Sequence, residues 1–178
     1  TLNKNLSESL SIPGKKSISI PLGEIKITRQ VKSLIVYFRS CAKVHLWKQN
    51  KRRIFGKPKS EYSLRSLKSI LKTITFAKEK MPDINFKIII IDDNSENNFL
   101  SNANKLINKY KIENNLINLN SNEFKNTTRD TNFASIYKSY ILAKEKADDL
   151  IYFVEDDYIH EKIAIHEMIM AYERISTQ

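Results

Sequence analysis

Residues 86–97, with the sequence FKIIIIDDNSEN, carry the pattern that decides the fold. A run of apolar residues leads directly into Asp92, Asp93, Asn94 and Ser95. A strand buried on both faces of a parallel sheet has such a continuous apolar run, and ligands bind outside the carboxyl ends of these strands. We therefore predict a buried strand over residues 86–91 that presents Asp92 and Asp93 at the ligand-binding edge of a sheet.

A second stretch, DLIYFVEDDYIH at residues 149–160, repeats this arrangement. An apolar run over residues 150–154 is followed by Glu155, Asp156 and Asp157. Adjacent carboxylates repel one another, so a folded protein tends to keep them where water or a cation screens their charge. Mg²⁺ and Mn²⁺ prefer oxygen ligands, and Mg²⁺ often uses one or two carboxylates together with substrate phosphates. The two acidic strand ends therefore predict a site for a metal ion and a polyhydroxylated or phosphorylated ligand.

Each acidic cluster also has a purely structural interpretation. One carboxylate of the Asp92-Asp93 pair could simply cap the following helix, as Asp commonly does. The cluster at residues 155–157 could be a solvated acidic turn. Both alternatives remain open at the level of sequence.

Strand-like and helix-like segments alternate along the chain. Helices are expected where apolar residues recur at spacings of three and four, and Ser95 is a natural N-cap for the second of them. The expected strands are residues 33–40, 86–91, 115–120 and 150–154, and the expected helices are residues 60–80, 95–110, 133–143 and 161–175. The third of these helices has Phe133, Ile136, Tyr140 and Ala143 on one face. This alternation predicts an α/β domain with a mainly parallel sheet flanked by helices over residues 33–178, after an extension over residues 1–32 in which residues 17–28 predict a β-hairpin.

Composition narrows the class of protein. The chain has 178 residues, of which 41% are hydrophobic, enough for one domain with a sizeable core. Cys41 is the only cysteine, which excludes a disulfide framework and a Cys-based zinc site. No apolar run approaches the ~20 residues of a membrane span, so we expect a cytoplasmic protein.

The charge is strongly basic, at +10 with 30 Lys and Arg residues. It points either to an anionic partner or to a surface that is merely solvated by lysine. The densest run is KQNKRRIFGKPK at residues 48–59, where peripheral membrane contact could come from Lys48, Lys51, Arg52 and Arg53. Nucleic acid is not expected as a partner, because the aromatic-plus-basic recognition motifs are absent from the sequence.

In their order and context, IIIIDDNSEN and YFVEDDYIH resemble the nucleotide-sugar half of family-two glycosyltransferases, which have the GT-A fold. In that family an Asp pair followed by Gly or Asn and then Ser ends one strand, and a short acidic motif of the DxD type ends a later one. The segment SLRSLKSILKTI in the first expected helix also resembles the family's first helix. The resemblance covers residues 33–175.

The resemblance implies a metal-dependent enzyme that transfers a sugar from a nucleotide-diphosphate donor to a glycan, lipid or protein acceptor. The cofactor would be Mn²⁺ or Mg²⁺, which would neutralise the charge growing on the leaving diphosphate. The implied metal ligands are Asp157 and Glu155, and Asp93 would contact the base while Asp92 supports its turn and Asp156 lies near the ribose or diphosphate. Residues that would also meet the nucleotide or its diphosphate are Phe38, Arg39, Ser40, Arg129 and Lys138.

The chain departs from the family's pattern in places. Phe38, Arg39, Ser40 and Cys41 stand where the family has a Pro or Thr and then a Tyr-Asn pair, and the basic insertion at residues 43–59 is longer than the family's. The family's acceptor-binding half, with the carboxylate that acts as base, lies beyond the point where this sequence stops. The expectation is therefore a GT-A domain truncated on its C-terminal acceptor side, with no catalytic base assigned.

Other functions remain open beside this one. The nearest is a nucleotide-sugar-binding module without catalysis. IIIIDDNSENN also resembles the acidic pair that opens a phosphoacceptor receiver domain, and a basic nucleic-acid-binding domain is a further alternative. His160, just after the acidic turn, could approach the metal, although the sequence favours a solvent-facing or capping role.

Overall fold

The computed structural model describes residues 5–6, 17–18, 27–42, 54–93, 95–119 and 131–176, and the chain divides into two compact units. The smaller unit comprises Thr1–Gln30 and Tyr172–Gln178. In it, β1 (Asn5–Leu6) pairs antiparallel with β2 (Ser17–Ile18). The turn and most of the second strand of the hairpin predicted over residues 17–28 lie outside the described residues. The larger unit, Val31–Ala171, contains the main sheet and the candidate site.

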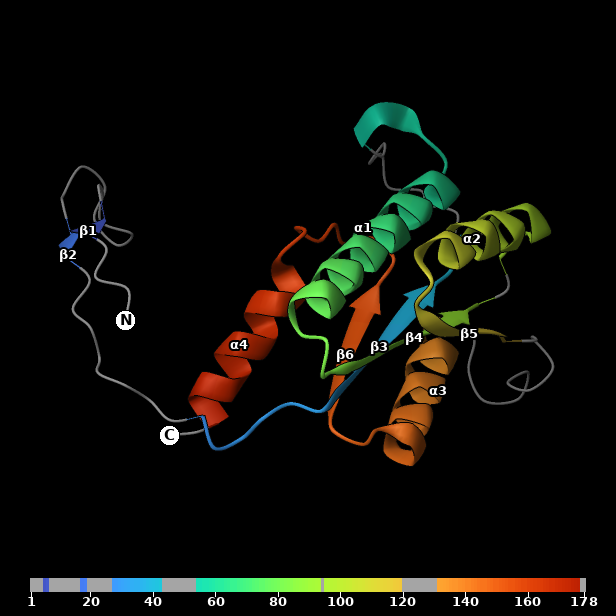
Figure 1. The fold of residues 1–178 in the computed structure, drawn as a ribbon. Helices are drawn as coiled ribbons and strands as arrows, with labels where there is room; N and C mark the ends of the chain where they lie inside the picture. Colours follow the sequence, from blue (N-terminus) through green and yellow to red (C-terminus); the bar gives the residue numbers. More distant parts are fainter. Residues whose placement is uncertain are drawn as a thin grey trace. The chain divides into compact units, whose positions relative to one another are not determined.

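The main sheet has four strands that are all parallel. They are β3 (Ser33–Ser40), β4 (Asn85–Asp92), β5 (Glu113–Asn118) and β6 (Leu150–Glu155). Their order across the sheet is β5-β4-β3-β6 (Figure 1). Counted in chain order this is 3-2-1-4, the order found in Rossmann-like α/β folds. The prediction of a parallel α/β sheet is therefore confirmed, with β5 beginning two residues earlier than expected.

Helices cover both faces of this sheet (Figure 1). They are α1 (Lys59–Lys80), α2 (Asn97–Tyr110), α3 (Thr131–Lys146) and α4 (Ala164–Ser176), and a short 3₁₀ helix, η1 (Ile54–Gly56), precedes α1. Residues of α1, α2 and α4 share one hydrophobic cluster with one face of the sheet, whereas α3 packs on the other face. Right-handed crossovers explain the division, because the chain reverses its direction across the sheet between β5 and β6. Among the described residues, no helix is both long enough and apolar enough to cross a membrane.

The isoleucine run of β4 is buried on both sides, as its continuous apolar pattern predicts. Ile88 and Ile90 pack in the cluster with α1 and α2, and Ile89 and Ile91 pack in the cluster with α3. All four are at most 1% exposed. Since successive strand residues point to opposite faces, such a run fits only a strand with a layer on each side.

The predicted apolar face of α3 is only partly correct. Phe133 and Tyr140 are more than half exposed, whereas the buried residues of the helix include Ala134, Leu142 and Ala143. These three aliphatic residues pack in the cluster on this face of the sheet. Tyr140 instead covers the ring of Phe153 on β6, with ring centroids 4.8 Å apart. Phe133 is therefore on the exposed side of α3, whereas Tyr140 lies over β6.

Candidate functional site

The two acidic clusters meet at the point where the sheet reverses its strand order. β3 pairs with β4 on one side and with β6 on the other, and its last residues lie opposite both clusters. In this register Ser40 is the partner of Asp92, and Arg39 is the partner of Glu155. In open parallel sheets, ligands bind at such a switch point, outside the carboxyl ends of the strands. The prediction that both clusters lie on one sheet edge is therefore confirmed.

Asp92 organises the turn between β4 and α2. Its side chain is fully buried, and its two oxygens accept hydrogen bonds from the Ser40 hydroxyl (2.7 Å), the Ser95 hydroxyl (2.7 Å) and the Ser95 backbone N–H (2.9 Å). The prediction that Ser95 is the N-cap of α2 is wrong, because Glu96 holds that position. The Ser95 hydroxyl instead accepts a hydrogen bond from the Ala42 backbone N–H (2.8 Å). The carboxylate of Asp92 is thus part of the scaffold that joins the ends of β3 and β4.

Asp93 follows at the end of β4. Its backbone N–H donates a hydrogen bond to the Ser40 carbonyl (2.8 Å), and its side chain is 7% exposed. Asp93 therefore lies directly beside the end of β3. The predicted contact of Asp93 with the nucleoside stays a prediction.

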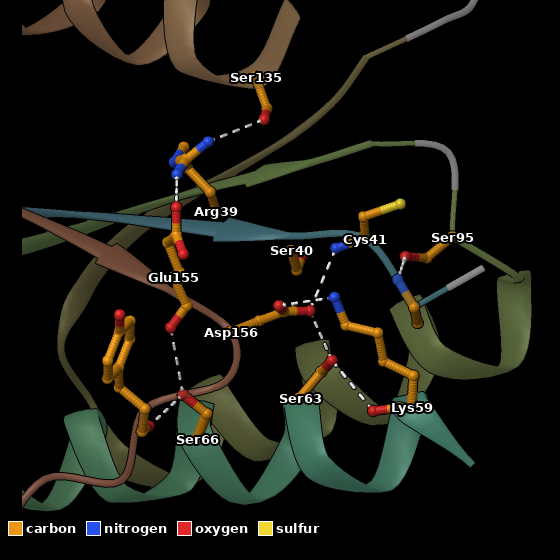
Figure 2. Close-up of polar contacts among 12 residues, drawn as sticks. Arg39, Ser40, Cys41, Lys59, Ser63, Ser66, Ser95, Ser135, Glu155 and Asp156 are labelled. Carbon is orange, nitrogen blue, oxygen red and sulfur yellow. Dashed lines mark hydrogen bonds and ion pairs between the residues drawn. The ribbon is translucent and has the colours of Figure 1, made fainter. Parts of the chain in front are cut away.

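Asp156 connects three elements (Figure 2). Its Oδ2 accepts hydrogen bonds from the Ser63 hydroxyl (2.6 Å) and the Cys41 backbone N–H (3.2 Å), and its Oδ1 lies 3.0 Å from the ammonium of Lys59. Lys59 and Ser63 belong to the first turns of α1, where the helix dipole also favours a negative charge. Both oxygens of the middle carboxylate are therefore engaged by the protein itself. A contact between this carboxylate and ribose or diphosphate, as predicted, would have to share these partners.

Glu155 forms an ion pair with Arg39, from Oε1 to Nη2 (Figure 2). The other guanidinium nitrogen, Nη1, donates to the Ser135 hydroxyl of α3 at 3.4 Å. The side chain of Arg39 is 11% exposed and that of Glu155 is 48% exposed. Arg39 and Lys59 are thus protein counterions for the first two carboxylates of the acidic turn, and they offset part of the repulsion between these charges.

Asp157 differs from its two neighbours. Its side chain is exposed, and in the described part of the chain no hydrogen bond or ion pair joins its carboxylate to another residue. No group of three or more His, Cys, Asp or Glu side chains that could hold a metal ion occurs in the described ranges. A divalent ion at Asp157 would therefore take most of its ligands from water and from the phosphates of a bound ligand, as Mg²⁺ commonly does.

A hollow of about 150 Å³ opens beside the end of β3. It lies between the first turns of α1 and α2, and Ala42 forms part of its wall. Leu64 and Phe99 give it apolar surface, while Asn98 and Asn102 give it amide groups. A volume of ~150 Å³ is enough for one aromatic ring system. The hollow could therefore hold part of a ligand but not a whole nucleotide sugar.

The remaining predicted residues are placed differently. Phe38 is fully buried in the hydrophobic cluster that includes α1, so a nucleotide contact from Phe38 would have to come from its backbone. Ser40 is buried as well, with its hydroxyl bonded to Asp92. Lys138 is half-buried on α3. Predicted residues that lie outside the described part of the chain are Arg129, Lys48, Lys51, Arg52 and Arg53.

A row of buried hydroxyl groups on α1 holds the segment that follows β6. Ser66 donates to the Tyr158 carbonyl (2.6 Å), Ser69 accepts from the His160 backbone N–H (3.0 Å), and Thr73 accepts from the Ile165 backbone N–H (3.0 Å). With Ser63, these residues recur at spacings of three and four, which places them on one helix face. This row was not predicted, although the spacing of Ser and Thr in SLRSLKSILKT indicates that these residues share one helix face.

His160 is part of this packing. Its Nε2 lies 2.9 Å from the Tyr152 hydroxyl, and the two rings meet edge to face with centroids 5.8 Å apart. Burial lowers the pKa of His160 below its ordinary value of 6.5. The neutral imidazole therefore belongs to the folded state, and His160 has a structural role between β6 and α1.

This burial predicts a measurable pH dependence of stability. Below pH 6.5 the unfolded chain binds a proton at His160 more readily than the folded chain does, so the free energy of unfolding falls as the pH drops from 6.5 through the lower pKa of the folded state. We expect the wild type to lose more stability between pH 7 and pH 5 than His160→Gln, measured by urea unfolding at each pH. An equal loss in the two proteins would contradict the assignment.

No protein-family model matches this chain, and no curated protein matches it.

Proposed function

We propose that this chain binds a nucleotide-diphosphate sugar at the switch point between β3 and β6 and is the donor-binding part of a metal-dependent glycosyltransferase. The observation that carries the proposal is the convergence of two acidic strand ends on either side of the end of β3, with Asp157 exposed there. The resemblance of both motifs to family-two glycosyltransferases with the GT-A fold supports the same function.

The proposal gives different tasks to different residues. Asp93 lies beside the end of β3 and is assigned to the nucleoside, whose base could enter the hollow next to Ala42. Asp157 is assigned to Mn²⁺ or Mg²⁺, because its carboxylate is exposed and, among the described residues, no ion pair or hydrogen bond holds it. When bound, the cation would neutralise the charge that grows on the leaving diphosphate as the acceptor displaces it from the anomeric carbon of the sugar. Asp92 and Asp156 hold the two turns in place.

The strand order argues against the receiver alternative. Flavodoxin-like receiver domains have the order 2-1-3-4-5, in which the first strand of the fold carries the acidic pair. Here the pair follows the second strand of the parallel sheet, and the order reverses at the first. A nucleotide-sugar-binding module without catalysis would use the same site. An assay for the release of nucleoside diphosphate from a donor sugar distinguishes the two, because only an enzyme would release it.

The test is thermal unfolding with a panel of nucleoside diphosphates, with and without Mn²⁺. We expect at least one of them to raise the melting temperature only when Mn²⁺ is present. At a ligand concentration of ~100 Kd the stabilisation is about 2.7 kcal/mol, which corresponds to roughly 5–10 °C for a chain of this size.

Asp157→Ala should remove this shift, whereas Asp148→Ala, which changes an exposed carboxylate just before β6, should keep it. If no nucleoside diphosphate stabilises the wild type in the presence of Mn²⁺, the proposed function is wrong. Nucleic-acid binding would give a different result, because it needs no divalent ion and weakens steeply with salt.

A further inference from the structure

The two ion pairs of the acidic turn differ in how firmly they are held. Asp156 is 7% exposed at its side chain and is bonded to Ser63 and Cys41 as well as to Lys59. Glu155 is 48% exposed, and the bond that the described residues give its carboxylate is the one to Arg39. The Asp156–Lys59 pair is therefore a fixed part of the scaffold, whereas the carboxylate of Glu155 can leave its partner for another ligand.

Arg39 lies at the switch point with its charge almost withdrawn from solvent. Its side chain is 11% exposed, and its guanidinium lies between Ser135 of α3 and the half-exposed Glu155 of β6 (Figure 2). A guanidinium carries five donors in a planar fork, which suits phosphate oxygens as well as it suits a carboxylate. Glu155 thus occupies a face of Arg39 that the oxygens of a diphosphate could bind.

A second carboxylate lies close to Glu155 along the chain. Asp157, two residues later, is the carboxylate assigned to the divalent cation. A cation bound there would attract Glu155, since Mg²⁺ and Mn²⁺ prefer oxygen ligands, and its charge would oppose that of Arg39. A diphosphate bound to the same cation would in turn attract Arg39.

We propose that Arg39 binds the diphosphate of the ligand and that Glu155 masks it until the metal arrives. In the free protein the two side chains form an ion pair. When the metal and the diphosphate bind, Glu155 turns to the metal and Arg39 turns to the phosphate. The exchange makes the site poor at binding a phosphate without its metal, and it rests on the donor site of the proposed function.

The test compares the binding of inorganic pyrophosphate in the absence of metal, by calorimetry, to the wild type and to Glu155→Gln. Removal of the masking charge should strengthen this binding by about two- to fivefold, the range expected for loss of a partly exposed ion pair. Asp157→Asn is the matched control, because it removes a neighbouring negative charge but not the partner of Arg39. If Asp157→Asn gains as much as Glu155→Gln, simple repulsion explains the effect and the exchange is wrong.

A second pair of variants assigns the gain to Arg39. In the background of Glu155→Gln, the further change Arg39→Gln should abolish the stronger binding, and persistence of the gain would overturn the proposal. Arg39→Lys replaces Arg39→Gln if the latter does not fold, and it should lose most of the gain because an ammonium lacks the fork. The ratio of affinities with and without Mn²⁺ should also be smaller in Glu155→Gln than in the wild type, and an unchanged ratio would contradict the turning of Glu155 to the metal.

The outcomes for the exchange and for the donor site are separable. An Arg39-dependent gain for pyrophosphate, in a protein that no nucleoside diphosphate stabilises with Mn²⁺, would keep the exchange and remove the sugar-nucleotide function. Mn²⁺-dependent binding of a nucleoside diphosphate, without any gain in Glu155→Gln, would keep the function and overturn the exchange.

Discussion

Replacement of Asp92 with alanine should lower the free energy of unfolding by about 3–5 kcal/mol, because three donors would lose their acceptor in a fully buried site. The donors are the hydroxyls of Ser40 and Ser95 and the backbone N–H of Ser95. The hydroxyls can rotate towards other acceptors, but the backbone N–H cannot. A domain with a stability of ~5–15 kcal/mol should remain folded after this loss, so the change can be measured by urea unfolding.

Two further variants identify the cause. Asp92→Asn keeps the volume but places an amide donor against existing donors, so it should cost a large part of the same free energy. If Asp92→Asn is neutral while Asp92→Ala is costly, a cavity rather than the hydrogen bonds accounts for the loss. Asp83→Ala, at an exposed carboxylate before β4, should change the stability by no more than ~0.5 kcal/mol.

Asp156→Ala should have the second largest effect, a loss of about 2–4 kcal/mol. It leaves the Ser63 hydroxyl and the Cys41 backbone N–H without their acceptor, and it leaves Lys59 without its counterion. The loss should be smaller than for Asp92, because the side chain of Lys59 is 21% exposed and can recover water.

Two comparisons make this prediction specific. Asp157→Ala alters the adjacent, exposed carboxylate and should leave the stability within ~0.5 kcal/mol of the wild type. A double-mutant cycle of Asp156→Ala with Ser63→Ala should give a coupling free energy of at least ~1 kcal/mol, because the two side chains share a buried hydrogen bond. Additive effects would mean that Asp156 acts without Ser63.

The strand runs and their acidic ends were predictable because they depend on local pattern. Ile88 to Ile91 could be recognised as a doubly buried strand from periodicity alone, and the parallel arrangement followed from the alternation of strands and helices. The order β5-β4-β3-β6 could not be obtained in this way. Alternation fixes the direction of the strands but not the side of the sheet to which each crossover returns.

The role of each carboxylate within the two acidic clusters could not be predicted from the local sequence pattern. Sequence shows three adjacent carboxylates at residues 155–157, but burial of the middle one depends on Lys59 and Ser63, more than 90 residues earlier in the chain. The sequence suggested that water or a cation screens these charges, and it gave no sign that Arg39 and Lys59 lie beside two of them. Such pairings arise only when distant elements pack together.

The buried face of α3 was also predicted incorrectly from local pattern. Large aromatic residues at helical spacing predicted the buried face, yet Phe133 and Tyr140 are more than half exposed. The helix packs on β3 and β4 through aliphatic residues, among them Ala134 and Leu142. Hydrophobicity at the correct period identifies a helix, but it does not decide which of the apolar residues approach the sheet.

The central place of β3 has a consequence for the order in which the chain can fold during its synthesis. The contact between Ser40 and Asp92 spans 52 residues, whereas the pair of Arg39 and Glu155 spans 116. Because the ribosome synthesises the chain from its N-terminal end, β3, β4 and β5 can pair before β6 has left the ribosome. During that time the side of β3 that will pair with β6 has no partner strand. Long-range parallel pairing of this kind is slow, so the unpaired strand is open to aggregation. The acidic turn of the candidate site is thus assembled last, when β6 closes that edge.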